Sequence, residues 1–445
     1  MNRDLTKGPV LRTMLRFSLP MILGNLLQQC YNLADTWVVG RCLGSNALAA
    51  VGSSFTLMTF LTSILLGLCM GSGAVFSIRF GQKDTRALQE SVRTSFLLIS
   101  VLTVILNVLA FVCLDGIRIF LQVPDAVWGL MRDYLKIIFC GIAATFLYNF
   151  FASYLRAVGN SVVPLWFLAV SAVLNIGLDL WFVIGLSRGV GGAAEATVLS
   201  QYIAGVGIMI YAVLRCPELR AKEKFRLRRR CLKEIADYSV LTCVQQSVMN
   251  LGILMVQGLV NSFGAPIMAA FAAAVKIDAF AYMPVQDFGN AFSTFTAQNY
   301  GAGEKERLRK GLKDALAASV LFSLAVSAVV FIFARPLMGL FVDSAETQIF
   351  AEGVRYLRIE GAFYFGIGIL FLLYGLYRAV GRPGMSVVLT VLSLGTRVVL
   401  AYALSALPAL GVVGIWWSVP IGWALADIVG ILYYVFRKKK LLAFS

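Results

Sequence analysis

The sequence predicts an all-α membrane protein with about twelve transmembrane helices in two six-helix lobes related by pseudo-two-fold symmetry along the membrane normal. Three observations lead to this prediction. Of the 445 residues, 59% are hydrophobic and only 14% are charged, outside the range of ordinary soluble domains. Apolar runs of about 20 residues, the length that crosses a bilayer, recur from end to end. The two halves of the chain also resemble each other.

The apolar runs predict the spans in order, with approximate boundaries: residues 15–40, 47–78, 91–114, 133–155, 162–185, 191–214, 238–262, 267–299, 312–334, 354–377, 385–407 and 410–436. Long unbroken runs favour helices over a β-barrel, whose strands are about 10 residues long and alternate apolar with polar. Within the second span, Gly67, Gly71 and Gly73 indicate close packing against another helix. We expect no cleaved signal, because the N-terminus lacks a short apolar core followed by a cleavage site.

The basic residues predict how the chain is oriented. The formal net charge is +16, and in a membrane protein such residues mark cytoplasmic loops, so no nucleic-acid partner is expected. Basic groups precede the first span and follow the second, sixth, eighth and twelfth spans, which all fall on one side. We therefore expect a multi-pass protein of the cell membrane, in contact with membrane lipid, with both termini in the cytoplasm. The opposite loops carry only scattered cations, among them Arg118 and Arg335.

The internal repeat defines the lobes. RFGQKDTRAL at 79–88 resembles NYGAGEKERL at 299–308, at an offset of about 220 residues. Residues 1–214 are predicted to form the N-terminal lobe, 215–237 a cytoplasmic basic linker and 238–445 the C-terminal lobe. In transporters built from such repeats, the substrate passes between two lobes that rock against each other. In the repeat Asp35 corresponds to Met255 and Asp179 to Ala401, so the acidic site is expected in the N-terminal lobe alone.

A polar face runs along the first span. Asn25, Gln28, Asn32 and Asp35 recur at spacings of three and four, which places them on one side of a helix, with Tyr31 beside them. A carboxylate in the hydrocarbon layer costs at least about 2.5 kcal/mol, so it normally faces an aqueous cavity or an ion path. The alternative is a structural aspartate bonded to other helices, but packing does not need so long a polar face.

The fifth span carries Asn175 and Asp179 one turn apart on one face. Asp35 and Asp179 are both expected about 8 to 9 Å below the outer surface, at a rise of 1.5 Å per residue. Two carboxylates in one cavity repel each other, which favours a bound proton or small cation. Oxygen ligands from Asp35, Asn175 and Asp179 suit Na⁺ better than a transition metal. A polar pair that only joins two helices remains the alternative.

Together the polar helix that starts at Pro20 and ends YNLADTWVVG, the NIGLD helix and the repeated RFGQKD and NYGAGEKE loops resemble the multidrug and toxic compound extrusion (MATE) family of transporters. The resemblance covers nearly the whole chain. It implies export of small organic, often cationic compounds in exchange for H⁺ or Na⁺. It also implies that Asp35, Tyr31, Asn175, Asp179 and Thr197 couple the ion, and that the first helix bends at Pro20.

Further side chains are candidates for the lining of a substrate passage. These are Gln28, Asn32, Met255, Lys276, Asp278, Tyr282, Met283 and Asp287. Lys276 and Asp278 are two residues apart, so they point to nearly opposite sides of a helix and are not expected to pair. For these two, pairing with other helices and contact with substrate stay equally open. Glu360 is expected to form an interfacial pair with Arg358.

The predicted function is a monomeric secondary antiporter without enzymatic activity and without a cofactor other than the transported H⁺ or Na⁺, between which the residues do not decide. One alternative is a flippase for a lipid-linked oligosaccharide, which would need cations such as Arg355, Arg358 and Arg397 to hold a pyrophosphate. A second is an intramembrane aspartyl protease, although IGLD at 176–179 lacks the second glycine of the GxGD type.

Overall fold

The structure, a computed structural model, describes residues 4–121, 123, 125–219, 227–342 and 346–441. Part of the predicted linker at 215–237 therefore lies outside the described residues. The part of the chain that the structure describes is helical and contains no strand. In these residues ten helices are long and apolar enough to cross a membrane, and the number rises to twelve if each of two bent helix pairs forms one span. The predicted all-α membrane fold is confirmed.

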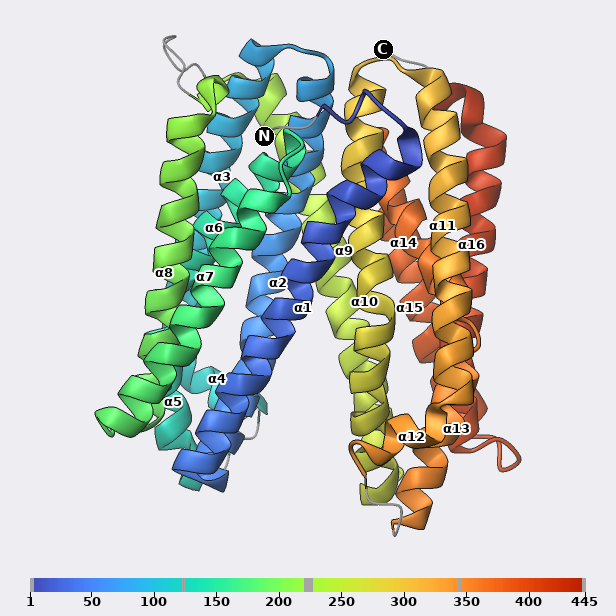
Figure 1. Cartoon of the computed structure of the whole chain (residues 1–445). Coiled ribbons are helices and arrows are strands. Elements are labelled where there is room, and N and C mark those ends of the chain that lie inside the picture. The colour runs from blue at the N-terminus through green and yellow to red at the C-terminus, as the bar shows by residue number, and fades with distance from the viewer. Residues whose placement is uncertain (1–3, 122, 124, 220–226, 343–345, 442–445) are drawn as a thin grey trace. The chain divides into compact units, whose positions relative to one another are not determined.

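The helices follow the predicted spans closely (Figure 1). They are α1 (Val10–Leu43), α2 (Ser45–Gly81), α3 (Thr85–Val112), α4 (Leu114–Leu121), α5 (Asp125–Cys140), α6 (Ile142–Ala157), α7 (Val162–Asp179), a π-helix (Leu180–Gly185), α8 (Gly189–Arg215), a 3₁₀ turn (Pro217–Leu219), α9 (Arg229–Asn261), α10 (Ala265–Gly301), α11 (Lys305–Ile332), α12 (Ala334–Gly339), α13 (Thr347–Gly361), α14 (Tyr364–Ala379), α15 (Pro383–Ser405) and α16 (Val412–Leu441).

The fourth and tenth predicted spans are each two helices. The axes of α5 and α6 differ by 42°, and those of α13 and α14 by 51°. Hydropathy could not reveal these bends, because both members of each pair are apolar. Each pair follows a short helix, α4 or α12, at the same place in its half of the chain.

Contacts divide the chain into two compact units. Unit 1 comprises residues 1–4 and 23–243, and unit 2 comprises residues 5–22 and 244–445. This division does not follow the predicted lobe boundaries, because α1 and α9 each belong to both units. The start of α1 packs within unit 2 and the start of α9 within unit 1. Pro20 lies inside α1, two residues before the point at which the helix changes units.

The segment that leads into α1 is tied into unit 2 by polar contacts with the end of α10 and the start of α11. Arg307 donates hydrogen bonds to the carbonyl oxygens of Leu5 (3.1 Å), Lys7 (3.1 Å) and Gly8 (2.6 Å). Gln298 accepts a hydrogen bond from the backbone nitrogen of Leu5 at 3.1 Å. Buried apolar side chains complete this attachment: Leu5, Val10, Met14, Phe17 and Met21 belong to the hydrophobic core of unit 2.

The start of α9 is tied into unit 1 in a comparable way. Arg79, in the last turn of α2, forms an ion pair with Glu234 at 2.6 Å, and Glu90 of α3 pairs with Arg228 at 3.4 Å. The repeated segments RFGQKDTRAL, which contains Arg79, and NYGAGEKERL, which contains Arg307, therefore share a structural role. Each helps to hold the beginning of a helix that ends in the other unit.

Close packing of α2 against α9 confirms the predicted role of two of its three glycines. A Cβ atom at Gly67 would lie 2.5 Å from the Cα of Cys243, and one at Gly71 would lie 2.3 Å from the carbonyl oxygen of Tyr238. Gly73 is different, since its Cβ would meet Ser153 at an ordinary 3.5 Å.

Replacement of Arg307 by glutamine is expected to loosen the start of α1. The change removes several hydrogen bonds from a guanidinium, each worth about 1.5–3 kcal/mol, and a cation–π contact with Phe295. We expect trypsin to cleave at Lys7 or Arg12 about tenfold faster or more, because cleavage follows local opening. Arg309→Gln is the matched control, since Arg309 forms an ion pair with the exposed Glu306 of its own helix. Equal cleavage of the two variants would contradict this role.

Candidate functional site

Asp35 of α1 and Asp179 of α7 lie next to each other in unit 1. Their carboxyl groups interact electrostatically, and Asp179 is fully buried whereas Asp35 is partly buried. One oxygen of Asp35 and both oxygens of Asp179 are shielded from solvent and accept no hydrogen bond from an N–H or hydroxyl group of a described residue. The two carboxyl groups are hydrogen-bonded to each other, which requires a proton on one of them. The convergence of two acids from distant helices, predicted from their matching depth, is therefore present in the structure.

A polar side chain one turn before Asp179 is bonded to the neighbouring helix α8. Asn175, one turn before Asp179 and 2% exposed, donates a hydrogen bond to the hydroxyl of Thr197 in α8 at 3.2 Å. That hydroxyl in turn donates to the carbonyl oxygen of Ala193 at 3.0 Å. The side-chain oxygen of Asn175 is buried and has no hydrogen-bond donor among the described residues. Asn175 and Thr197 therefore form a bonded polar pair one turn from Asp179 along the same buried face of α7.

The helix geometry explains why Asp179 points inward. Asp179 is the last residue of α7, and the chain continues into the π-helix Leu180–Gly185. A π-helix widens the turn and shifts the side-chain register, and such turns are frequent at functional sites. The buried face of α7 is small and polar, with Ser171, Ala172 and Asn175 beside Asp179, whereas Val173 and Trp181 are exposed.

Two tyrosines also reach the acid pair. Tyr31 interacts with Asp35 and with Gln28, as its place on the polar face of α1 predicts. Tyr134 of α5 is buried and interacts with Asp35, Asp179 and Tyr31, and it was not predicted. The internal repeat could have indicated Tyr134. DYLKI at 133–137 resembles RYLRI at 355–359, so Tyr134 aligns with Tyr356 in the second half of the sequence.

Such a site can hold a proton or a small hard cation. Two neighbouring carboxylates repel each other, so the pair is more stable with a positive charge between them. The oxygens of Asp35, Asp179, Asn175 and Thr197 are hard ligands of the kind that suits an alkali ion. Among the described residues no three His, Cys, Asp or Glu side chains converge as a transition-metal site would require.

Unit 2 contains a second cluster of buried acids, so the expectation that the acids are confined to the first lobe is wrong. Asp278 of α10 and Glu360 of α13 interact with each other, with Tyr356 and with Arg397 of α15. The hydroxyl of Tyr364 donates a hydrogen bond to Asp278. The repeat did not predict this cluster, because Asp278 and Glu360 occupy positions at which the first half has Met58 and Ile138.

The expected interfacial pair of Glu360 and Arg358 is not present in the structure, so this second prediction is wrong. Glu360 is only 4% exposed and belongs to the buried cluster. Arg358 is exposed, and its guanidinium carbon lies 5.6 Å from the ring centre of Phe331. Two residues apart on α13, the two side chains leave the helix in different directions.

The other candidate lining residues are scattered between exposed and buried positions. Gln28, Met255 and Lys276 are exposed, Asn32 and Tyr282 are partly buried, and Met283 and Asp287 are buried. Lys276 and Asp278 lie on opposite sides of α10, as predicted. Of the predicted lining residues in unit 2, Tyr282 and Asp278 are the two that share the acidic cluster.

The MatE family model matches residues 20–181 and 240–403 of the chain, which include both acids of the unit 1 pair. The chain belongs to the MatE family. A relative, the probable multidrug resistance protein YpnP of Bacillus subtilis, is 29% identical over 98% of this chain and 97% of its own length. A FAD transporter of Shewanella oneidensis is 25% identical over 98% of this chain and 96% of its own length.

Solved structures of the MATE family have the same fold. The outward-facing structure of a multidrug resistance MATE family transporter of the MOP superfamily aligns with a TM-score of 0.91 and 25% identity, covering 99% of this chain and 98% of that one. The predicted family is therefore confirmed. The chain is a multi-pass membrane transporter and not an enzyme, which removes the aspartyl protease alternative.

Proposed function

We propose that this MATE family member exports small organic compounds in exchange for H⁺ or Na⁺, which binds at Asp35 and Asp179. The observation that carries the proposal is the unit 1 acid pair, whose carboxyl groups bond to each other while three of their buried oxygens receive no hydrogen bond from an N–H or hydroxyl group of a described residue. A purely structural aspartate would have its hydrogen bonds satisfied, because an unpaired buried polar atom costs about 1–3 kcal/mol. A bound ion would satisfy these oxygens.

In this mechanism the ion enters from outside and binds between Asp35 and Asp179, with Asn175 and Thr197 beside them. Binding changes the packing around Asp35 in α1. Since α1 belongs to both units and contains Pro20 next to the change of unit, a shift of its second half can be passed to its first half. Proline removes one backbone hydrogen bond, which makes this the weakest point of the helix. We expect this movement of α1 to release the cargo by alternating access.

The energy for export would come from the ion gradient. One charge that moves inward through the membrane potential supplies about 2.3 kcal/mol per 100 mV. By the distribution of basic residues, we place the protein in the cytoplasmic membrane with both termini in the cytoplasm. The polar face of α1, with Asp35 on it, favours cationic or amphiphilic cargo, in keeping with the relative named for multidrug resistance. The protein is expected to act as a monomer.

Two of the three arginines named for the flippase alternative lie beside carboxylates. Arg397 interacts with Asp278 and Glu360, and Arg355 pairs with Glu352 at 2.8 Å. These guanidiniums are thus partly neutralised by carboxylates. One relative is named as a FAD transporter. Because FAD carries negatively charged phosphates, anionic compounds are the competing class of cargo.

Separate ion steps on reconstituted vesicles test the proposal. Vesicles loaded with a fluorescent organic cation receive either an acid step or a Na⁺ step on the outside, at a fixed membrane potential. Antiport predicts that one of the two steps accelerates cargo release above the leak from protein-free vesicles. If neither step changes the release of an organic cation, and FAD is released instead, the proposed cargo class is wrong.

A further inference from the structure

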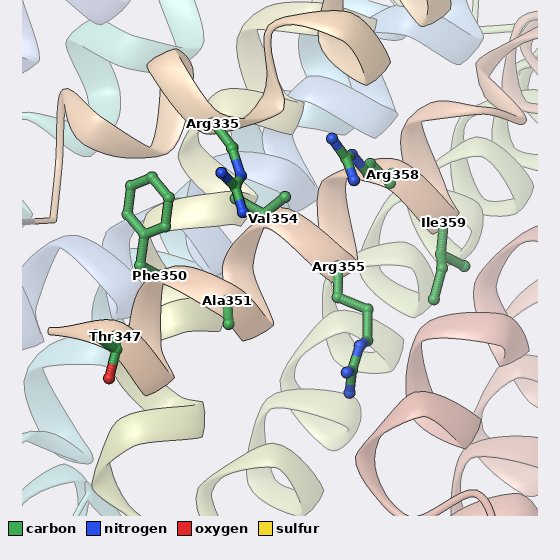
Figure 2. Close-up of a pocket in the computed structure, with 8 residues that line it drawn as sticks. All are labelled: Arg335, Thr347, Phe350, Ala351, Val354, Arg355, Arg358 and Ile359. Carbon is green, nitrogen blue, oxygen red and sulfur yellow. The ribbon is translucent and has the colours of Figure 1, made fainter. Parts of the chain in front are cut away.

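A cationic pocket lies between α12 and α13 of unit 2. It has a volume of about 580 Å³ and is lined by Arg335, Thr347, Phe350, Ala351, Val354, Arg355, Arg358 and Ile359 (Figure 2). We refer to these residues as the α12–α13 pocket. The volume falls within the range typical of small-molecule sites, and three of the eight lining residues are arginines.

Two of the arginines carry most of the free positive charge. Arg355 is bonded to Glu352, and in Figure 2 its side chain points away from those of Arg335 and Arg358. Arg358 is held against the ring of Phe331 by a cation–π contact, and Arg335 forms no ion pair with a described carboxylate. Guanidiniums present a planar fork of donors that matches a phosphate group.

The same place in unit 1 is built differently. There α4 and α5 also present two arginines, but Arg118 forms an ion pair with Asp125, and Arg132 lies 4.0 Å from Asp115. In the repeat Asp115 corresponds to Arg335, so the acid of the first half is replaced by a base in the second. The charge at Arg335 is thus specific to unit 2, whereas Lys136 of unit 1 matches Arg358.

The residues around the pocket are of the kind that contacts membrane lipid. Exposed apolar side chains flank α12 on both sides along the chain: Phe331, Ile332, Phe333, Leu340 and Phe341. Chain order places α12 at the end of α11 opposite Lys305 and its basic loop (Figure 1). With the orientation of the proposed function, this is the outer end of the bundle, where basic residues are normally scarce.

We propose that the α12–α13 pocket binds the phosphodiester headgroup of an anionic phospholipid from the outer leaflet. Arg335 and Arg358 bind the phosphate oxygens, and Phe350, Val354 and Ile359 contact the glycerol and the first carbons of the acyl chains. The exposed apolar residues beside α12 favour a lipid over free phosphate, because they provide a surface for the acyl chains. Basic pockets between membrane helices bind anionic lipid headgroups by the same chemistry.

Native mass spectrometry of the purified full chain in a neutral detergent tests this site. Phosphatidylglycerol is compared with phosphatidylcholine of the same acyl chains, and soluble glycerol phosphate is added as a competitor. We expect one phosphatidylglycerol to bind about tenfold or more tightly than phosphatidylcholine, and glycerol phosphate not to displace it. Equal binding of the two lipids would overturn the proposal, and displacement by glycerol phosphate would overturn the lipid assignment.

The double variant R335Q/R358Q is expected to lose the preference for phosphatidylglycerol, whereas Arg118→Gln, at the corresponding place in unit 1, should keep it. Both arginines of the pocket are exposed, so the fold should tolerate their loss. The variant R335K/R358K keeps the charge without the fork and should retain part of the preference. An unchanged preference in R335Q/R358Q would overturn the site. This test is independent of ion coupling, so its failure leaves the proposed antiport untouched.

Discussion

Asp35→Asn is expected to reduce ion-driven export to the level of protein-free vesicles while the protein stays folded. Asparagine has the same shape as aspartate, but its amide does not bind a proton near neutral pH. It also lacks the negative charge that attracts a cation. The fold should tolerate the change, because a buried oxygen of Asp35 accepts no hydrogen bond from an N–H or hydroxyl group of a described residue. The new amide could donate to Asp179, so the melting temperature should stay the same or rise. Transport by reconstituted vesicles and thermal unfolding in detergent check both halves of this prediction.

The control for Asp35→Asn is Glu195→Gln. Glu195 lies in α8 of the same unit, but it is partly exposed and pairs with Arg188 at the protein surface. Removal of such an exposed pair is worth about 1 kcal/mol or less, and transport should remain near that of the unchanged protein. Normal coupled export by Asp35→Asn, or equal loss in Glu195→Gln, would contradict the assigned role.

Gly71→Ala is expected to destabilise unit 1 severely. The added methyl group would lie 2.3 Å from the carbonyl oxygen of Tyr238 and 2.6 Å from the Cα of Ser239, which are backbone atoms that cannot rotate away. α2 and α9 must separate, which also weakens the hydrogen bond between the hydroxyls of Ser72 and Ser239 at 2.8 Å. Overpacking of this kind costs about 1–3 kcal/mol or more. The yield of monodisperse protein and its melting temperature measure the effect.

Gly73→Ala is the matched control on the same helix. Its methyl group would meet Ser153 at 3.5 Å, an ordinary van der Waals distance. Since alanine is favoured over glycine within a helix by about 0.8–1 kcal/mol, this variant should be neutral or slightly more stable. If both alanine variants behaved alike, close approach of α2 to α9 would not be the reason for Gly71.

Much of the fold could be predicted because membrane helices are recognised in a sequence by their length and hydropathy. The repeat added the division into halves, but it could not show that α1 and α9 each belong to both units. That division depends on contacts such as those of Arg307 with Leu5 and Gly8, which join segments about 300 residues apart. The bends between α5 and α6 and between α13 and α14 were missed for a related reason, since apolar runs continue through them.

The acid pair of unit 1 could be predicted because a carboxylate in an apolar helix is costly and must serve a purpose. Matching depth then suggested that Asp35 meets Asp179. Tyr134 was missed because it stands at the edge of its predicted span, where tyrosines are common. The cluster of Asp278 and Glu360 was missed because the repeat was read in one direction. The acids of the first half were located and their counterparts in the second half were compared, so acids that occur only in the second half were not detected.

The count of ions released on cargo binding tests the central claim most directly. Purified protein is titrated with an organic cation in weakly buffered solution, while released H⁺ and Na⁺ are measured. If ion and cargo exchange through the unit 1 acid pair, binding should release about one ion per cargo molecule, and binding of the ion should weaken cargo affinity by the same coupling. The double variant D35N/D179N should release none. Cargo binding that is insensitive to pH and Na⁺, or undiminished release from the double variant, would contradict the account.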